Sequence, residues 1–444
     1  MREPRSAYDN VRADPGRRLR VAMFVHEFPA LSETFVLNQI TGLIDLGHDV
    51  TIFATGARGD PMMHPDVHAY GLLNRLHYRG MPESRVARVL GAPVAAVRCA
   101  FRRPAALVKS LNLARYAGDA RSLSLLYWSS CLRAQEKFDI VHCHFGTVGR
   151  EVAFLREIGA IGGKLVVSFH GVDMSACLED GDKLYRHLFE KGDLFLPISD
   201  HWRQRLIGMG SDPPRTCVHR MGVDLRRFPF QRWTKAAGRA MEILTVGRLV
   251  EKKGIEYGLR AVAQAATRGM PLRYSIVGDG PLRDRLERLA DDLGIGGQTT
   301  FLGWQDQERV IEMLRTSDIL LAPSVTDKNG DQEGIPVTLM EAMASGVLVV
   351  STRHSGIPEL VSSGTTGFLA EERDVGGIAH ALDTLICDPG LGERMSVAAR
   401  AKVAAAFDIG VLNRQLEAHY RMLLSSGVPA ASSASMWRAA SSAD

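Results

Sequence analysis

Short apolar runs alternate with longer amphipathic stretches along most of this chain, and this alternation constrains its fold more than any other feature. In the first half, six runs have the length and composition of buried strands, at residues 19–25, 49–54, 139–144, 165–169, 193–198 and 216–219. The first two flank an expected helix, which Ser32 would cap and Gly47 would end. Continuous apolar strands separated by helices indicate a parallel sheet covered on both faces.

The same rhythm restarts near residue 240. The strands expected in this second half are 242–246, 273–277, 299–302, 318–321, 347–351 and 367–369. Between the two series lies a polar, proline-containing stretch, 223–238, which we interpret as the link between two domains. The predicted fold class is therefore α/β, with two Rossmann-like, doubly wound parallel sheets facing each other across a ligand-binding cleft.

Domain boundaries follow from these series. A first domain is expected at 19–225 and a second at 239–408, followed by an amphipathic helix at 409–424. The arm 1–18 is rich in arginine, and the tail 425–444 is rich in serine and alanine. We expect the arm to be flexible and the tail to be disordered, because neither can bury much apolar surface.

Composition excludes several classes of function. The 444 residues carry 54 basic and 50 acidic side chains, and a net charge of +4 is too small to indicate nucleic-acid binding. Six scattered cysteines form no CxxC pair, which favours a reducing compartment over a disulfide scaffold or a zinc site. No apolar run is long enough to span a membrane, and the first eighteen residues do not resemble a signal peptide. We therefore expect the protein in the cytoplasm.

The stretch 323–346 (PSVTDKNGDQEGIPVTLMEAMASG) is the most informative part of the sequence. An acidic loop leads to Glu333 and Gly334, and Pro336 then stands in the expected first turn of a helix, where neighbouring free amides can bind phosphate. Glu341 would lean back along that helix toward the same end. A nucleotide-sugar site requires one carboxylate beside the reacting centre and a second that accepts hydroxyl hydrogen bonds. Taken alone, this spacing would be better explained by solvated acidic residues on a surface loop.

Two further motifs follow strands of the same half. In 247–254 (GRLVEKKG), Gly247 lets backbone approach an anion, and Arg248 and Lys253 can neutralise two phosphates, although a turn with a solvated basic face explains the motif equally well. The turn 277–281 (VGDGP) also lacks bulky side chains and is weak by itself. Because all three motifs lie at carboxyl ends of strands in one half, together they indicate a diphosphate ligand.

In the first half, a histidine followed by glycine comes directly after an expected strand. A lone histidine is more often structural, but the position of His170 at a carboxyl end, before Gly171, favours the cleft. His142 and His144 alternate along one strand and share a face, but no third ligand for a metal ion is evident. The first strand runs into HEFPALSE without any glycine, so NAD or FAD binding is not expected.

Residues 73–121 interrupt the alternation. They hold ten lysines and arginines against Glu83 and Asp119, with apolar residues between the charges. Two interpretations stay open for this basic segment: a solvated surface, or an amphipathic lip on an anionic membrane. The second would attach the protein peripherally to the inner face of the cell membrane, and a lipid-linked acceptor would require it.

Together, the motifs resemble those of family 4 retaining glycosyltransferases, which have the GT-B fold, over nearly the whole span 19–424. The matching motifs are GRLVEKKG at 247–254, VGDGP at 277–281, EGIPVTLME at 333–341, the His170-Gly171 pair and MGVD at 221–224. The segments FPALSETFVLNQITGL, HCHFG and DKNGDQEGIPVTLMEAMASG look closest to bacterial exopolysaccharide transferases of the colanic acid and amylovoran type.

The resemblance implies a role for each matching residue. It makes Glu333 the carboxylate that contacts the donor sugar, Glu341 the partner of the ribose, and His170 a donor-sugar contact from the other domain. The residues implied to line the nucleotide sugar are Gly247, Arg248, Lys253, Gly278, Asp279, Glu333, Gly334, Ile335, Pro336, Val337 and Glu341. Where the family usually carries a glycine-rich first loop, this chain has FPALSE. The residues expected on the acceptor side are Ser32, Glu33, His144 and Asp173.

The expected function is transfer of a hexose from a UDP- or GDP-sugar to an oligosaccharide or lipid-linked glycan, with retained anomeric configuration. Glu333, His170, Arg248 and Lys253 would carry the catalysis. Cations and a helix N-terminus aimed at the leaving diphosphate would make a metal ion or other cofactor unnecessary.

Three alternatives remain. A GT-B epimerase acting on UDP-N-acetylhexosamine would leave the basic segment 73–121 unexplained. A non-catalytic nucleotide-sugar-binding subunit would have no use for Glu333 at the reacting carbon. A Rossmann dehydrogenase is opposed by the missing glycine loop.

Overall fold

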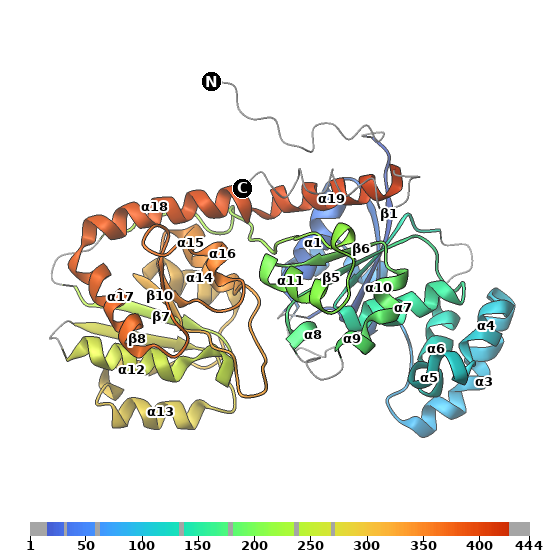
Figure 1. Cartoon of the computed structure of the whole chain (residues 1–444), viewed down its shortest axis with the longest axis horizontal. Helices are drawn as coiled ribbons and strands as arrows, with labels where there is room; N and C mark the ends of the chain where they lie inside the picture. The colour runs from blue at the N-terminus through green and yellow to red at the C-terminus, as the bar shows by residue number, and fades with distance from the viewer. Residues whose placement is uncertain are drawn as a thin grey trace. The chain divides into compact units, whose positions relative to one another are not determined.

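The computed structural model describes residues 16–30, 33–57, 63–132, 137–175, 181–234, 239–267 and 271–425 (Figure 1). These residues fall into two compact units. Unit 1 is drawn from Met1–Pro197, Arg203–His219 and Asn413–Asp444, and unit 2 from Ile198–Trp202 and Arg220–Leu412.

Unit 1 is built on a parallel sheet of six strands. The strands are β1 (Arg20–Glu27), β2 (Asp49–Gly56), β3 (Leu76–Tyr78), β4 (Ile140–His144), β5 (Lys164–Phe169) and β6 (Leu194–Pro197), in the order β3-β2-β1-β4-β5-β6. Five of them confirm the sequence prediction, and β3 was not predicted. The predicted strand at 216–219 is wrong, because Thr216 forms a single isolated bridge to Phe195 of β6.

Helices connect these strands. They are α1 (Thr34–Asp45), α2 (Pro65–Ala69), α7 (Gly146–Glu157), α8 (Val172–Ser175), α9 (Gly181–Leu184), α10 (Arg186–Lys191) and α11 (Asp200–Gly208), with 3₁₀ turns η2 (Leu72–Arg75) and η3 (Pro213–Arg215). The predicted first helix is confirmed as α1, which begins one residue after Glu33. Ser32, predicted as its cap, lies outside the described residues.

The basic segment and the residues that follow it form four helices: α3 (Arg85–Arg102), α4 (Pro104–Ser110), α5 (Leu113–Arg121) and α6 (Ser124–Cys131). Figure 1 shows them gathered in a cluster of their own within unit 1. Ala95 and Cys99 of α3 pack against Leu126 and Tyr127 of α6 in a small apolar core. The side of α3 opposite to this core is therefore left for solvent or a partner.

Helix α19 (Ile409–Ser425) confirms the predicted C-terminal helix and completes the core of unit 1. Leu416, Tyr420 and Met422 of this helix pack with Val21 and Met23 of β1. The end of the chain therefore stabilises the sheet that its beginning forms, a long-range pairing that amphipathic periodicity does not predict.

Unit 2 repeats the architecture. Its parallel strands are β7 (Met241–Val246), β8 (Leu272–Val277), β9 (Thr299–Phe301), β10 (Ile319–Ala322), β11 (Leu348–Thr352) and β12 (Phe368–Ala370), in the order β12-β11-β10-β7-β8-β9. All six confirm the sequence prediction. Ile319 and Leu321 of β10 face one apolar cluster, and Leu320 faces the other, so both faces of the sheet are buried.

The helices of unit 2 cover these two faces. They are α12 (Ile255–Ala266), α13 (Arg283–Asp292), α14 (Gln307–Thr316), α15 (Val337–Ser345), α16 (Ile357–Leu360), α17 (Val375–Cys387) and α18 (Pro389–Ala406), with η4 (Glu251–Lys253) and η5 (Gly296–Gln298). Within the described ranges, none of the helices in either unit combines the length and apolarity needed to cross a bilayer.

The strand order of each sheet reverses at one point, between β1 and β4 in unit 1 and between β7 and β10 in unit 2. In open parallel sheets, ligands bind outside the carboxyl ends of the strands at such a switch point. The loops after β7 and β10 are 247–254 and 323–336, which contain two of the three motifs found in the sequence.

Candidate active site

Backbone hydrogen bonds join the loops after β7 and β8. Gly247 N donates to Val277 O at 2.9 Å, Leu249 N donates to Asp279 O at 2.9 Å, and Leu282 N donates to Leu249 O at 3.1 Å. The motifs 247–254 and 277–281 therefore lie side by side at the carboxyl edge of the sheet.

Two glycines allow this close approach. Gly278 has φ +129°, and a Cβ there would lie 2.0 Å from Gly247 O. Gly254 has φ +62°, and a Cβ there would lie 1.9 Å from Pro323 O. Only glycine fits either position. Gly254 thus packs the loop after β7 onto the loop after β10, where Val325 N also donates to Lys252 O at 2.9 Å.

Glu333 lies where these two loops meet. Its Oε2 is 3.0 Å from Lys253 Nζ, and its Oε1 is 3.6 Å from Lys252 Nζ, which also lies 2.9 Å from Asp331 Oδ2. Burial acts to raise the pKa of Glu333, but the two lysines outweigh it, so the pKa is lowered and the carboxyl is ionised at neutral pH. The structure therefore brings together two residues whose roles were predicted separately.

Arg248 is placed differently from Lys253. Its side chain is exposed, and within the described residues no hydrogen bond or ion pair to it is recorded. Asp279, by contrast, accepts a hydrogen bond from Gly280 N at 2.7 Å and lies 3.3 Å from Arg283 Nη1. Arg248 is thus available to a ligand, whereas the described contacts of Asp279 hold its own loop.

Helix α15 begins at the end of the loop that carries Glu333. Pro336 is its N-cap and Val337 its first residue, so the prediction that Pro336 stands in the first turn is wrong by one position. The amides of a first helical turn have no acceptor within the helix and attract anions. Ile335 is 2 % exposed and packs in the core, so its side chain anchors the loop and only its backbone can face a phosphate.

Glu341 lies one turn further along α15 and is 9 % exposed. Burial raises the pKa of its carboxyl to about 7, against a smaller lowering by Arg227. No described residue is recorded as donating a hydrogen bond to this carboxylate. A buried carboxylate of this kind is stabilised by ligand hydroxyls that donate to it.

His354 is a residue at this site that sequence reasoning missed. It follows β11, is 0 % exposed, and its Nε2 lies 2.9 Å from Glu333 N. Its Nδ1 lies 2.6 Å from Glu372 Oε1. No motif marked His354 or Glu372. The residues that His354 contacts, Glu333 and Glu372, stand 21 and 18 positions away from it along the chain.

In unit 1, three predicted histidines form one stack, in which His142 and His144 are buried and His170 is half-buried. The His142 and His144 rings are 4.9 Å apart, and those of His144 and His170 are 5.1 Å apart. His144 Nδ1 lies 2.9 Å from His170 Nε2. Burial lowers the pKa of His144 to about 3, and burial followed by neighbouring histidines lowers that of His170 well below its usual range. Both rings are therefore neutral at physiological pH.

His170 has one buried ring nitrogen without a recorded partner in the described part of the chain. This nitrogen is Nδ1, and it lies at the end of β5. Asp173 fixes the same turn, since it accepts hydrogen bonds from His170 N at 3.0 Å and Gly146 N at 2.8 Å. His144 and Asp173 were expected on the acceptor side. Their described contacts are with the protein, and they hold His170 in place.

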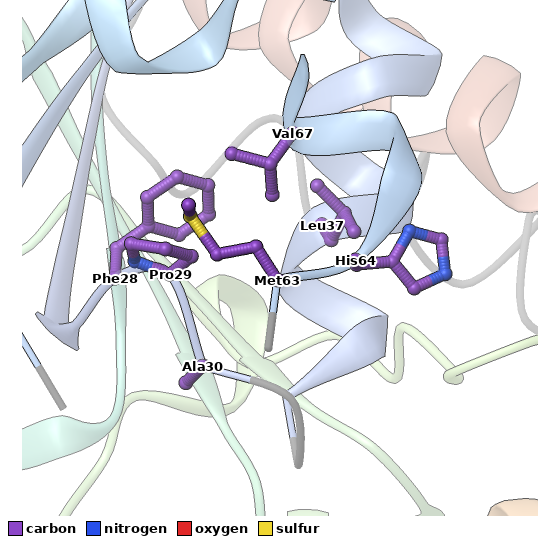
Figure 2. A pocket seen from close by; sticks show the side chains of 7 residues that line it. All are labelled: Phe28, Pro29, Ala30, Leu37, Met63, His64 and Val67. Atoms are coloured by element: carbon purple, nitrogen blue, oxygen red, sulfur yellow. The ribbon is translucent and has the colours of Figure 1, made fainter. Parts of the chain in front are cut away.

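The loop after β1 carries the remaining acceptor-side predictions. Glu33 is the N-cap of α1, and Ser32 lies outside the described residues. A small, mostly apolar pocket adjoins this loop (Figure 2), and it is lined by Phe28, Pro29, Ala30, Leu37, Met63, His64 and Val67. Phe28, Pro29 and Ala30 therefore contribute apolar surface at the position where a glycine-rich loop was expected from the family.

In the part of the chain that the structure describes, no cluster of three or more His, Cys, Asp or Glu side chains has the geometry to hold a metal ion. The charged groups at the switch point of unit 2 are instead the lysine pair, Arg248 and two glutamates. Two doubly wound sheets in succession, with such a site at the second switch point, define a GT-B glycosyltransferase.

Comparison with known proteins agrees with this class. The family model "Glycosyl transferases group 1" matches residues 229–402, and "Glycosyl transferase 4-like domain" matches 32–222. The chain therefore belongs to the glycosyltransferases that these two family models describe. It is 40 % identical over 404 residues to the "Putative colanic acid biosynthesis glycosyltransferase WcaL" of Salmonella typhimurium, covering 90 % of this chain and 98 % of the relative. It is 36 % identical to the "Amylovoran biosynthesis glycosyltransferase AmsK" of Erwinia amylovora, with the same coverage of both chains.

Solved structures confirm the fold. The Anabaena protein Alr3699/HepE, crystallised with UDP, superposes with a TM-score of 0.66 at 16 % identity, covering 90 % of this chain and 98 % of that one. The lipopolysaccharide outer core galactosyltransferase WaaB superposes with a TM-score of 0.64, also at 16 % identity, covering 90 % of this chain and 99 % of that one.

Proposed function

We propose that this chain transfers a hexose from a nucleoside diphosphate sugar to a glycan acceptor in exopolysaccharide biosynthesis, with retention of anomeric configuration. The observation that carries the proposal is the pairing of Glu333 with Lys253 beside the N-terminus of α15. It supplies an ionised carboxylate for the donor sugar next to positive charge for the diphosphate. The relatives named for colanic acid and amylovoran biosynthesis support the class of pathway.

Each residue has a role in this proposal. Arg248, Lys253 and the first amides of α15 bind the diphosphate, and they stabilise the negative charge that grows on it as the sugar leaves. Glu341 accepts hydrogen bonds from the ribose hydroxyls, and His170 contacts the donor sugar through Nδ1. These fixed cations and dipoles face the leaving group, so the proposed reaction is metal-independent.

The donor class is tested by thermal denaturation with UDP, GDP, ADP or NAD, without added metal. The Alr3699/HepE protein was crystallised with UDP and with UDP-glucose, which supports a uridine donor. A nucleotide at a hundred times its Kd stabilises the folded protein by about 2.7 kcal/mol. Stabilisation by UDP or GDP supports the proposal, and a response to NAD alone contradicts it.

The reaction type is tested by proton NMR of the product formed from an α-linked UDP- or GDP-hexose. An α-linked product supports retention, and a β-linked product contradicts it. Formation of an epimerised sugar without any acceptor would support the epimerase instead. Nucleotide-sugar binding without turnover would support a non-catalytic binding subunit.

We also propose that the acceptor is lipid-linked and that helix α3 lies on the inner face of the cell membrane. Six large apolar side chains on α3 are 55 % to 88 % exposed: Val86, Val89, Leu90, Val94, Val97 and Phe101. Most recur three or four positions apart, so they share the side of the helix opposite to its buried Ala95 and Cys99. We call them the α3 apolar face. Burial of such a face in a bilayer is favourable.

Charge argues for an anionic lipid surface as the partner of this face. Arg85 and Arg98 are exposed on α3 itself, and Lys109 is exposed on the next helix, α4. Each basic side chain near an anionic leaflet contributes about 1 kcal/mol. Flotation with phosphatidylglycerol-containing vesicles at low salt tests the proposal, with phosphatidylcholine vesicles for comparison. Failure to float with the anionic vesicles contradicts it.

A further inference from the structure

His354 forms hydrogen bonds to two glutamates, to the backbone of Glu333 and to the side chain of Glu372. On one side Glu333 N lies 2.9 Å from His354 Nε2, and on the other Glu372 Oε1 lies 2.6 Å from His354 Nδ1. A backbone amide can only donate, so Nε2 must carry the lone pair. The proton of the neutral ring is therefore on Nδ1, where it is donated to Glu372. The two partners together allow a single tautomer.

Glu372 is itself held in place. Thr326 N donates to its Oε2 at 2.8 Å, and Thr326 Oγ1 donates to its Oε1 at 3.1 Å. Burial acts to raise the pKa of Glu372, but the hydrogen bonds from His354 and Thr326 outweigh it, so the pKa is lowered and the side chain is ionised. Glu372 thus holds the loop after β10 at Thr326, and His354 holds the same loop at Glu333.

We propose that His354, oriented by Glu372, is the positioning residue that holds the Glu333 backbone and so aims the Glu333 carboxylate at the donor sugar. This inference rests on the proposed function of Glu333. His354 touches the amide of Glu333, so it acts through Glu333 and has no described contact with the carboxylate itself. It also sets a condition on pH, because only a neutral imidazole can accept the amide hydrogen bond.

Protonation of His354 turns Nε2 into a donor that faces the Glu333 amide at 2.9 Å, and the hydrogen bond is lost. The groups around the ring shift the pKa of His354 in both directions. Burial lowers the pKa of His354 most strongly, Glu372 and Glu333 raise it, and His201 lowers it. Arg373 lies 3.5 Å from Glu372, and Lys252 and Lys253 pair with Glu333. The net pKa is lowered, so the bond is intact at neutral pH and breaks on acidification.

Hydrogen–deuterium exchange of the Glu333 amide tests the bond without any need for catalysis. Mass spectrometry at pH 7 compares the full-length wild type with His354→Leu and His354→Gln. We expect the leucine variant to exchange this amide at least tenfold faster, because its acceptor is gone. Glutamine keeps a carbonyl oxygen near Nε2, so it should restore part of the protection. Equal exchange in wild type and the leucine variant would overturn the proposal.

The catalytic consequence is measured as release of nucleotide from UDP-glucose and GDP-mannose. His354→Leu should lower kcat by about 10²-fold, since small displacements of a reacting group have effects of this size. The affinity for UDP or GDP, measured by thermal shift, should stay within a few-fold of wild type. Loss of nucleotide affinity together with kcat would indicate a merely structural role.

Glu372→Gln separates positioning from folding by its pH profile. The charge of Glu372 raises the pKa of His354, so its removal should move the acid limb of kcat to lower pH. Glu371→Gln is the matched control, because Glu371 is an exposed neighbour that pairs with Arg353 at 3.2 Å. An acid limb that stays in place in Glu372→Gln would overturn the proposal. Absence of turnover in the wild type would count against the proposed function, whereas the exchange result would still decide the role of His354.

Discussion

Lys253 Nζ lies 3.0 Å from Glu333 Oε2, and this pair joins the loops on the two sides of the switch point in unit 2. Eighty positions separate the residues in sequence. Lys253 therefore has two tasks in the proposed site: it keeps the buried Glu333 ionised, and it offers positive charge to the diphosphate. The Arg248 side chain has no recorded partner among the described residues, so we assign it to ligand binding alone.

This difference predicts distinct effects for two alanine variants. Arg248→Ala should lower kcat by about 10²–10³-fold, as loss of one preorganised charge at a transition state does. It should leave the stability of the free protein unchanged. Lys253→Ala should lower kcat similarly and also lower the free energy of unfolding by about 1–3 kcal/mol, since Glu333 loses a buried partner. Steady-state kinetics and urea denaturation measure the two effects.

Arg273→Ala is the control for both variants, because Arg273 is exposed on β8 and pairs only loosely with Glu242, at 3.5 Å. It should change neither kinetics nor stability. If Arg248→Ala stays within a few-fold of wild-type kcat, the assignment of Arg248 to the diphosphate is wrong.

Glu341→Gln should make the folded protein more stable and weaken its binding of nucleotide. Burial raises the pKa of Glu341 to about 7, from 4.5, so the folded state holds a proton that the unfolded state has lost between these values. Folding is therefore penalised as pH rises from 4.5 to 7, by up to about 3 kcal/mol above pH 7. The glutamine variant removes this penalty. Its melting temperature should exceed that of wild type at pH 8 and match it near pH 4.5.

The same variant should bind UDP or GDP at least tenfold more weakly, because an amide cannot accept two ribose hydrogen bonds as a carboxylate does. Isothermal titration at pH 8 measures this loss. A variant that is stabilised at pH 8 and binds nucleotide as wild type does would exclude Glu341 from the ribose site.

Asp173→Asn should destabilise unit 1 and leave nucleotide binding intact. The two carboxylate oxygens accept one amide each, from Gly146 and His170. Asparagine presents an NH₂ group to one of these amides, which leaves a buried donor unsatisfied at a cost of about 1–3 kcal/mol. Urea denaturation measures this cost. Asp212→Asn is the control, because the half-buried carboxylate of Asp212 pairs with the Arg215 side chain at 3.0 Å and does not cap η3. Equal unfolding midpoints for both variants would contradict the structural role of Asp173.

The predictable part of the fold is the part that local apolar patterning specifies. The central strands of unit 2 were found because runs such as 347–351 are buried on both faces and bounded by polar turns. β3 was not predicted, although β9 and β12 are equally short and half-exposed, because a histidine stands between its two apolar residues, Leu76 and Tyr78, and breaks the apolar run. The segment 216–219 has strand-like composition but forms a single isolated bridge to β6. Composition does not predict how many residues of a segment will pair with a neighbouring strand.

The predictable part of the site is the set of residues that lie in recognisable motifs. Gly254 and Gly278 were found from their motifs, although the neighbours they touch were not. The Lys253–Glu333 pair and the His354–Glu372 link depend on which loops the sheet brings together, and a single sequence does not encode that in any local pattern. A lone histidine in STRHSG is indistinguishable from a surface residue until its burial is known.

Leu90→Ser combined with Phe101→Ser should weaken binding to anionic vesicles by at least tenfold. Both side chains belong to the α3 apolar face and are 74 % and 88 % exposed, so the folded protein loses no packing. Each contributes about 1.5–3 kcal/mol when fully buried in an apolar phase. Vesicle flotation measures the change. Trp304→Ser, which removes an aromatic side chain 59 % exposed in unit 2, is the control. Equal flotation of the double variant and the wild type would rule out insertion of this face.

Gly278→Ala should disrupt the site through backbone sterics alone. A Cβ at this position would lie 2.0 Å from Gly247 O, and φ +129° is unfavourable for any residue with a side chain. The loop of Arg248 must then move away from that of Asp279, so nucleotide stabilisation should be lost and the melting temperature should fall. Gly297→Ala is the matched control, because a Cβ there meets nothing within 4 Å and φ is not positive. If both variants bind UDP or GDP as wild type does, the contact between the two loops does not shape the nucleotide site.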